Sequence, residues 1–170
     1  MKVLVATEKP FAAVAVKGIR DIIEGAGHEL ALLEKYTEKE QLLAAVADAD
    51  ALIVRSDKVT AEVIEAAKQL KVIVRAGAGY DNIDLKACTD RGIVAENTPG
   101  QNSNAVAELA IAMMLYMSRN QFNPGTGCEL SGKTLGIQGF GNIGQLVAKK
   151  AVALGMNVLI YTNEVKEKHQ

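Results

Sequence analysis

The sequence is poor in aromatic residues and in the side chains that most often act as catalysts. Aromatic residues make up 4% of its 170 residues and tryptophan is absent, so alanine, valine, leucine and isoleucine must form most of the core. One of its two histidines, His28, falls at a turn, and the other, His169, is the penultimate residue. Neither accompanies a serine or cysteine in a nucleophile motif. We therefore assign no catalytic residue to this chain.

Cysteine is scarce, and an excess of charge of one sign and long apolar runs are lacking. Cys88 and Cys128 lie too far apart for a metal motif, and we expect two buried or unreactive thiols and no metal. The 19 basic and 20 acidic residues nearly cancel, which argues against nucleic-acid and membrane-surface partners. No apolar run reaches the roughly 18 residues of a membrane span, and the longest is broken by Glu108. The start of the chain lacks a signal-peptide pattern, so we expect a soluble, cytoplasmic protein.

Short β-branched runs alternate with longer helical patterns through the first 98 residues. The predicted strands cover 2–7, 28–34, 51–56, 71–77 and 93–97. The intervening helices are bounded by Gly25 and Gly27, by a capping box of Thr37 and Glu40, by Thr60 and by Asp84. Continuous apolar strands joined by helices predict an α/β fold with a doubly wound parallel sheet covered on both faces. A flavodoxin-like strand order would place the switch point between the first and third strands, and residues 1–98 would form a complete domain.

A second α/β unit begins after Pro99 and Gly100. We expect a helix from Ser103 to Arg119 and then a linker rich in glycine and asparagine, so that 99–132 connects two domains. A strand at 133–138, a helix from 142 and a strand at 157–162 follow. Residues 133–170 are thus interpreted as the first βαβ of an incomplete Rossmann NAD-binding unit, whose hydrophobic parallel edge is left unpaired.

The segment "GFGNIG" carries the glycine spacing of a dinucleotide-binding turn, between a predicted strand and a predicted helix. Gly139 would permit the tight turn, Gly141 would leave space for a pyrophosphate, and Gly144 would let the helix pack on the strand. The alternative is a glycine turn that only packs. Thr162 stands where an acidic residue usually binds the adenosine ribose, and Glu164 follows two residues later, which leaves NAD or NADP open.

In the first domain, ligands are expected at the carboxyl ends of the strands. Arg55 and Ser56 end one predicted strand and Arg75 ends the next, directly before a loop in which Gly77 and Gly79 would free backbone amides for an anion. The alternatives are a structural ion pair for Arg75 and glycines that only turn the chain. Asp81 and Asp84 are interpreted as helix caps rather than as an acid and a base.

Four segments together resemble the D-isomer-specific 2-hydroxyacid dehydrogenases: "VRSDKVT", "RAGAGYDNIDL", "NTPGQNSNAVAELAIAMML" and "LSGKTLGIQGFGNIGQLVAKKAVALGMNV". The resemblance covers residues 1 to about 161 and implies a substrate domain and an NAD domain with the active site in the cleft between them. It implies substrate contacts from Arg55, Ser56, the amides of Ala78 and Gly79, Asn102 and Ser103. With the glycine motif, the implied cofactor contacts are Gly139, Phe140, Gly141, Asn142, Ile143, Gly144 and Thr162.

The resemblance also implies what the chain would do and what it would lack. In the family, an arginine orients the 2-oxo acid, and a histidine paired with a glutamate exchanges the proton as hydride moves. All three lie beyond position 170, so we expect a truncated enzyme, inactive by itself. The full-length protein would be a homo-oligomer that oxidises a small phosphorylated 2-hydroxy acid, 3-phosphoglycerate, with NAD. The alternatives are a glyoxylate- or lactate-type member and a non-catalytic module that binds small anions or oligomerises.

Overall fold

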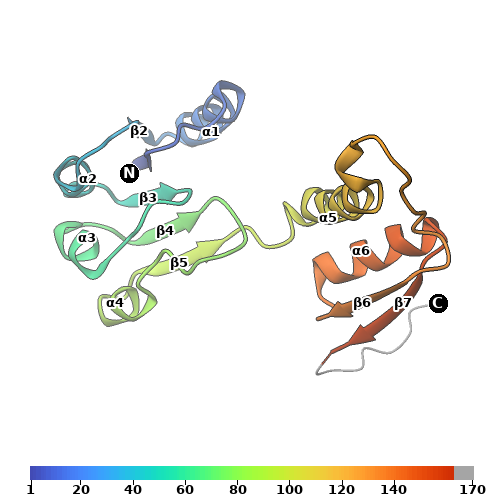
Figure 1. Ribbon diagram of the computed structural model, residues 1–170. Helices are drawn as coiled ribbons and strands as arrows, with labels where there is room; N and C mark the ends of the chain where they lie inside the picture. Colours follow the sequence, from blue (N-terminus) through green and yellow to red (C-terminus); the bar gives the residue numbers. More distant parts are fainter. Residues whose placement is uncertain (163–170) are drawn as a thin grey trace. The chain divides into compact units, whose positions relative to one another are not determined.

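The computed structural model describes residues 1–162, and it divides the chain into two compact units, Met1–Pro99 and Gly100–Gln170. We call them the first and the second unit (Figure 1). Glu164 and His169 lie outside the described residues. No helix among the described residues is long and apolar enough to cross a membrane.

The first unit is built on a five-stranded parallel sheet with the order β2-β1-β3-β4-β5. Its strands are β1 (Lys2–Thr7), β2 (Glu29–Glu34), β3 (Ala51–Val54), β4 (Val72–Arg75) and β5 (Val94–Asn97). This order confirms the flavodoxin-like prediction and places the switch point between β1 and β3. Apart from the shorter β3 and β4, the strands lie close to where the apolar runs predicted them.

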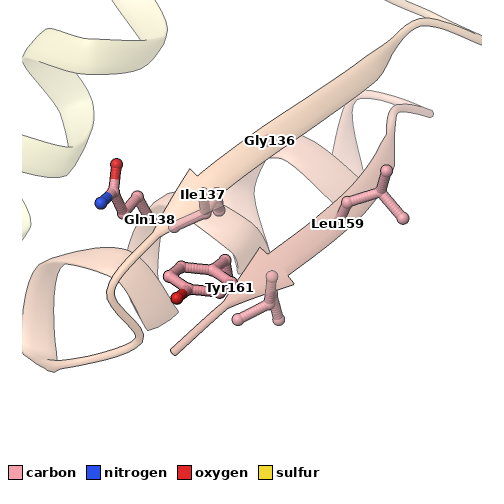
Figure 2. Close-up of a pocket in the computed structure, with 6 residues that line it drawn as sticks. Gly136, Ile137, Gln138, Leu159 and Tyr161 are labelled. Atoms are coloured by element: carbon pink, nitrogen blue, oxygen red, sulfur yellow. The ribbon is translucent and has the colours of Figure 1, made fainter. Parts of the chain in front are cut away.

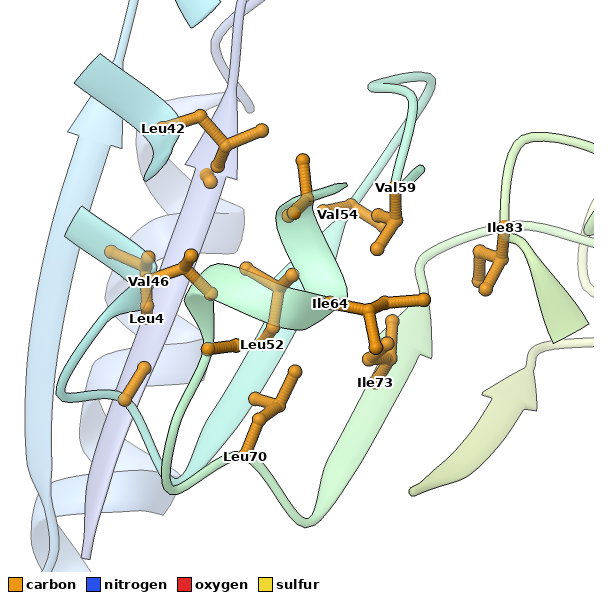
Figure 3. Packing of buried hydrophobic residues seen from close by; sticks show 14 of the residues in the cluster. Leu4, Leu42, Val46, Leu52, Val54, Val59, Ile64, Leu70, Ile73 and Ile83 are labelled. Carbon is orange, nitrogen blue, oxygen red and sulfur yellow. The ribbon is translucent and has the colours of Figure 1, made fainter. Parts of the chain in front are cut away.

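The core of the first unit lies against one face of this sheet (Figure 3). Leu52 of β3 and Ile73 of β4 are fully buried there, against Val46 and Ile64 from two of the four helices. These helices are α1 (Ala13–Gly25), α2 (Lys39–Val46), α3 (Ala61–Ala66) and α4 (Leu85–Asp90). Burial of aliphatic side chains from both strands and helices is the main source of stability here, since each contributes about 1.5–3 kcal/mol.

The helix starts of the first unit were predicted with mixed success. Asp84 caps α4 as expected, because its Oδ1 accepts a hydrogen bond from the Ala87 amide at 3.0 Å. The capping box of α2 was placed one residue too early. It uses Glu38 and Gln41, and Gln41 Oε1 accepts from the Glu38 amide at 3.1 Å. Glutamine and glutamate both have the length to reach back to the cap amide, so the pattern alone allowed two registers.

The second unit contains a single parallel pair of strands among the described residues, β6 (Thr134–Gln138) and β7 (Asn157–Tyr161). They are joined by α6 (Asn142–Ala153), and α6 packs on the long helix α5 (Ser103–Ser118). A single 3₁₀ turn, η1 (Asn120–Phe122), follows α5. The apolar cluster of the second unit has three buried members, Leu130, Ala151 and Met156. The extent of a linker between the two units, 99–132, stays a prediction.

Candidate functional site

The candidate substrate site begins at the carboxyl end of β3, where Arg55 and Ser56 are exposed. The peptide groups of Arg55 are held on both sides. Its amide donates to Asp57 Oδ2 at 3.3 Å, and its carbonyl accepts from Arg75 Nε at 2.8 Å. The expectation of an ion pair for Arg75 is therefore replaced by a hydrogen bond to backbone. Its guanidinium also occupies the space where a side chain at position 77 would begin, so a larger residue there would displace the guanidinium.

The loop after β4 presents two neighbouring backbone amides. Gly77 was expected to leave its backbone amide free for an anion, but this amide donates to the Arg75 carbonyl at 2.8 Å. In the part of the chain that the structure describes, the amides of Ala78 and Gly79 have no hydrogen-bond acceptor. The loop is nevertheless held, since Asn97 Nδ2 donates to the Ala78 carbonyl at 2.7 Å. Two adjacent unpaired amides in a loop are donors of the kind that bind a carboxylate or phosphate oxygen.

A buried carboxylate, Asp57, lies between the carboxyl ends of β1 and β3, and no sequence pattern singled it out. It is 5% exposed. Its Oδ1 accepts from the Glu8 amide at 2.7 Å and from the Tyr36 hydroxyl at 2.9 Å. Burial and the hydrogen bond to Asp57 raise the pKa of Tyr36 far above its ordinary value. An aspartate in "RSDK" reads as an ordinary turn residue, and only the fold reveals its partners.

Both cysteines are now placed. Cys88 is buried, and burial raises the pKa of its thiol. Cys128 is exposed, so of the expected buried or unreactive thiols only Cys88 is shown to be buried, and an unreactive Cys128 stays a prediction. His28 is half-buried at the turn before β2. Within residues 1–162, no group of three histidine, cysteine or acidic side chains is arranged to hold a metal ion.

The glycine turn between β6 and α6 has the geometry that its spacing predicts. Gly139 has φ +89°, which other residues rarely adopt, and its amide donates to the Tyr161 carbonyl at 2.7 Å. A Cβ at Gly144 would collide with the Gly139 carbonyl oxygen, so α6 approaches the turn closely only with glycine there. Gly141 is different, because no atom lies within 4 Å of the position where its Cβ would be. That open place at the start of α6 fits an incoming phosphate.

The first turn of α6 supplies the donors for such a phosphate. The first amides of a helix lack intrahelical acceptors and carry a partial positive charge, and here they belong to Asn142 and Ile143. Both residues are exposed. Phe140 is half-buried, and its carbonyl is held by Gln145 Nε2 at 3.0 Å. Thr162 follows β7 directly and is half-buried. Phe140, Asn142 and Ile143 fit the pyrophosphate of a dinucleotide, and Thr162 stands at the position expected for the adenosine ribose.

A hollow of about 480 Å³ lies along β6 and β7 (Figure 2). The register pairs Gly136 with Leu159 and Gln138 with Tyr161, so these four residues share one face of the two strands. Leu135 and Val158 belong to the opposite face, which packs on the apolar cluster of the second unit. Leu159 and Tyr161 remain 66% and 69% exposed.

The two remaining predicted substrate residues belong to the second unit. Ser103 is the first residue of α5 and is 5% exposed. Asn102 precedes it as the N-cap, exposed and without a capping hydrogen bond from its side chain. Their predicted contact with substrate stays a prediction.

The comparisons with known proteins agree with one another. The family model described as D-isomer specific 2-hydroxyacid dehydrogenase, catalytic domain, matches residues 5–169. The crystal structure of NAD⁺-bound 3-phosphoglycerate dehydrogenase from Entamoeba histolytica has a TM-score of 0.92 and 53% identity, over 98% of this chain and 56% of that one.

Two curated relatives extend the comparison. A hydroxypyruvate reductase of Thermotoga maritima is 46% identical over 147 residues, which cover 78% of this chain and 48% of the relative. A D-3-phosphoglycerate dehydrogenase of Methanocaldococcus jannaschii is 49% identical over 137 residues, covering 72% of this chain and 26% of the relative. The chain thus spans half or less of the length of these curated relatives.

Proposed function

Because the chain belongs to the D-isomer-specific 2-hydroxyacid dehydrogenase family, we propose that it supplies the substrate-carboxylate site and the pyrophosphate turn of an NAD-dependent 3-phosphoglycerate dehydrogenase. The observation that carries this proposal is the pair of unpaired amides at Ala78 and Gly79, on the same sheet edge as the exposed Arg55. The 53% identity to the Entamoeba histolytica enzyme supports the choice of substrate.

The proposed site binds 3-phosphoglycerate at its carboxylate. The two loop amides donate to the carboxylate oxygens, and the guanidinium of Arg55 supplies a positive charge and paired donors. The oxidation transfers a hydride from the hydroxyl-bearing carbon to the nicotinamide, and the hydroxyl proton leaves to a base. The residues of this chain bind and orient the acid, and we assign the base to none of them.

NAD is the proposed cofactor. The family and its NAD-bound members support it, and the turn at Gly139, Gly141 and Gly144 offers the matching shape. When bound, NAD would accept the hydride, while the amides of Asn142 and Ile143 hold its pyrophosphate. We expect the 170-residue chain to bind NAD weakly, because one βαβ unit provides only part of a dinucleotide site.

We also propose that the protein associates with a second copy of itself. Along α5, apolar side chains recur at helical spacing and remain exposed, at Val106, Leu109, Met113, Tyr116 and Met117. An exposed apolar stripe of this kind is typical of an interaction surface. This stripe supports our proposal that a second copy of the protein covers the exposed face of α5.

Calorimetric titration of the 170-residue chain with 3-phosphoglycerate tests the proposed function. We expect Arg55→Gln to weaken binding by about tenfold or more, because a charge-assisted contact is lost. Arg20→Gln is the matched control, since Arg20 lies half-buried on α1 and, among the described residues, its side chain pairs only with Glu24, four residues along the helix. Equal affinities for wild type and Arg55→Gln, or no binding by the wild type, would reject the proposal.

The same titration separates a second candidate, a hydroxypyruvate reductase, which the 46% identity to the Thermotoga maritima protein favours. A site for phosphorylated substrate would bind 3-phosphoglycerate more tightly than D-glycerate or hydroxypyruvate. Equal or tighter binding of hydroxypyruvate would favour the reductase instead. Tight binding of inorganic phosphate alone would point to a non-catalytic anion-binding module.

A further inference from the structure

We propose that Asp57, together with Arg75, positions Arg55 for substrate binding by clamping the Arg55 backbone from both sides. This inference rests on the function proposed above, in which Arg55 contacts the carboxylate of the acid. It assigns a role to a buried carboxylate that touches no substrate.

The first argument is the environment of Asp57. Its carboxylate is nearly fully buried, and among the described residues it forms no ion pair. A buried carboxylate without a cation is costly unless several donors satisfy it. Three do so, from the amide after β1, the hydroxyl of Tyr36 and the amide of Arg55. Such an arrangement fixes the donors as firmly as it fixes the acceptor.

The second argument is what the clamp holds. The Arg55 amide donates to Asp57 Oδ2, and the Arg55 carbonyl accepts from Arg75 Nε. With both of its backbone polar groups engaged, the residue has a fixed Cα–Cβ direction, although its side chain is exposed. The Asp57 carbonyl in turn accepts from Asn82 Nδ2 at 2.8 Å, which ties this turn to the end of the loop that carries Ala78 and Gly79. The clamp therefore fixes the backbone from which the Arg55 side chain extends and ties it to the loop with the two amides.

The third argument is that the two carboxylate oxygens have separate partners. Oδ1 holds Glu8 and Tyr36, whereas Oδ2 holds Arg55. Asp57→Asn keeps the shape and one acceptor oxygen. With that oxygen kept in the Oδ1 place, its NH₂ group faces the Arg55 amide, donor against donor. Tyr36→Phe removes a bond to Oδ1 and leaves the contact to Arg55. The pair of variants separates positioning of Arg55 from general support of the sheet edge.

The experiment compares 3-phosphoglycerate binding and thermal unfolding of the 170-residue chain and its variants. We expect Asp57→Asn to weaken binding by about tenfold and Tyr36→Phe by less than about twofold, while both lower the melting temperature. In an Arg55→Gln background, Asp57→Asn should weaken binding by less than about a further twofold, because the effect runs through Arg55. A merely structural carboxylate would give the same loss in both backgrounds.

A second variant keeps the proposal testable if Asp57→Asn fails to fold. Arg75→Met removes the carbonyl side of the clamp at an exposed hydrogen bond, and we expect severalfold weaker binding with little change in melting temperature. Wild-type affinity in both Asp57→Asn and Arg75→Met, or equal losses in Asp57→Asn and Tyr36→Phe, would overturn the positioning role alone. Absence of binding by the wild type would reject the proposed function, and the role of Asp57 with it.

Discussion

The two units of this chain share one architecture, parallel strands joined by helices, but they differ in how much of it is buried. In the first unit, five strands and their helices enclose fully buried side chains such as Leu52 and Ile64. In the second unit, the described residues supply two strands, and Leu159 and Tyr161 on their open face remain largely exposed. Strand pairing alone therefore does not make a core, which also needs helices packed against the sheet.

The candidate sites follow the same contrast. In the first unit, side chains hold the candidate site together. Asn97 donates to the carbonyl of Ala78 in the loop after β4. Asn82, from the end of the same loop, donates to the carbonyl of Asp57, whose side chain accepts from the Arg55 amide. In the second unit, the glycine turn between β6 and α6 is held mostly by backbone hydrogen bonds and by the close packing of Gly144. Site geometry in the first unit therefore depends on side chains, and in the second on glycine.

The largest expected effect is the loss of a core side chain from the first unit. We expect Leu52→Ala to lower the free energy of unfolding by about 2–5 kcal/mol, because it leaves a cavity at a fully buried position. Leu159→Ala, the matched change in the second unit, should alter it by about 0.5 kcal/mol or less. Urea unfolding followed by NMR signals from each unit measures both. A large loss in Leu159→Ala would indicate that another surface covers β7.

An intermediate effect is expected at the glycine turn. Gly144→Ala should destabilise the contact of α6 with the turn by about 1–3 kcal/mol, since its Cβ collides with the Gly139 carbonyl. Gly141→Ala is the control, because its Cβ would enter open space. Amide hydrogen exchange in α6 measures the difference and should rise in Gly144→Ala alone. Similar exchange in both variants would contradict the packing role of Gly144.

How much of this was predictable from the sequence depends on the range of the interactions. The strand positions, the cap at Asp84 and the turn at Gly139 follow from local patterns, because apolar runs, a cap residue and glycine spacing act over a few positions. The strand order follows from these positions through the topology rules for parallel sheets. The roles of Asp57 and Arg75 were not predictable. Their partners lie 49 residues away at Glu8 and 20 residues away at Arg55, respectively. The Gly77 amide was misjudged for a different reason, because its acceptor is only two residues away but the glycine pattern does not show that the loop bends back on Arg75.

The smallest expected effect concerns acid stability and again separates the units. In the first unit, the Lys2 amide donates to Asp50 Oδ2 at 2.8 Å and Lys71 lies at 3.2 Å from Oδ1. These contacts, the backbone hydrogen bond foremost, hold the pKa of Asp50 below its usual range. A lowered pKa in the folded state contributes stability that is present above about pH 4 and is lost as the pH falls further.

We therefore expect Asp50→Asn to flatten the decline of melting temperature between neutral and acidic pH, when unfolding is followed by signals from β1. Asp21→Asn, at an exposed carboxylate paired with Lys17 four residues earlier, should leave that decline unchanged. Signals from β6 should respond to neither substitution, because the side-chain hydrogen bonds of Asp50 among the described residues join it to Lys2 and Lys71 of the first unit. If Asp50→Asn changes the pH dependence of the melting temperature equally for β1 and β6, the two units unfold together. That result would reject the difference in stability between the two units.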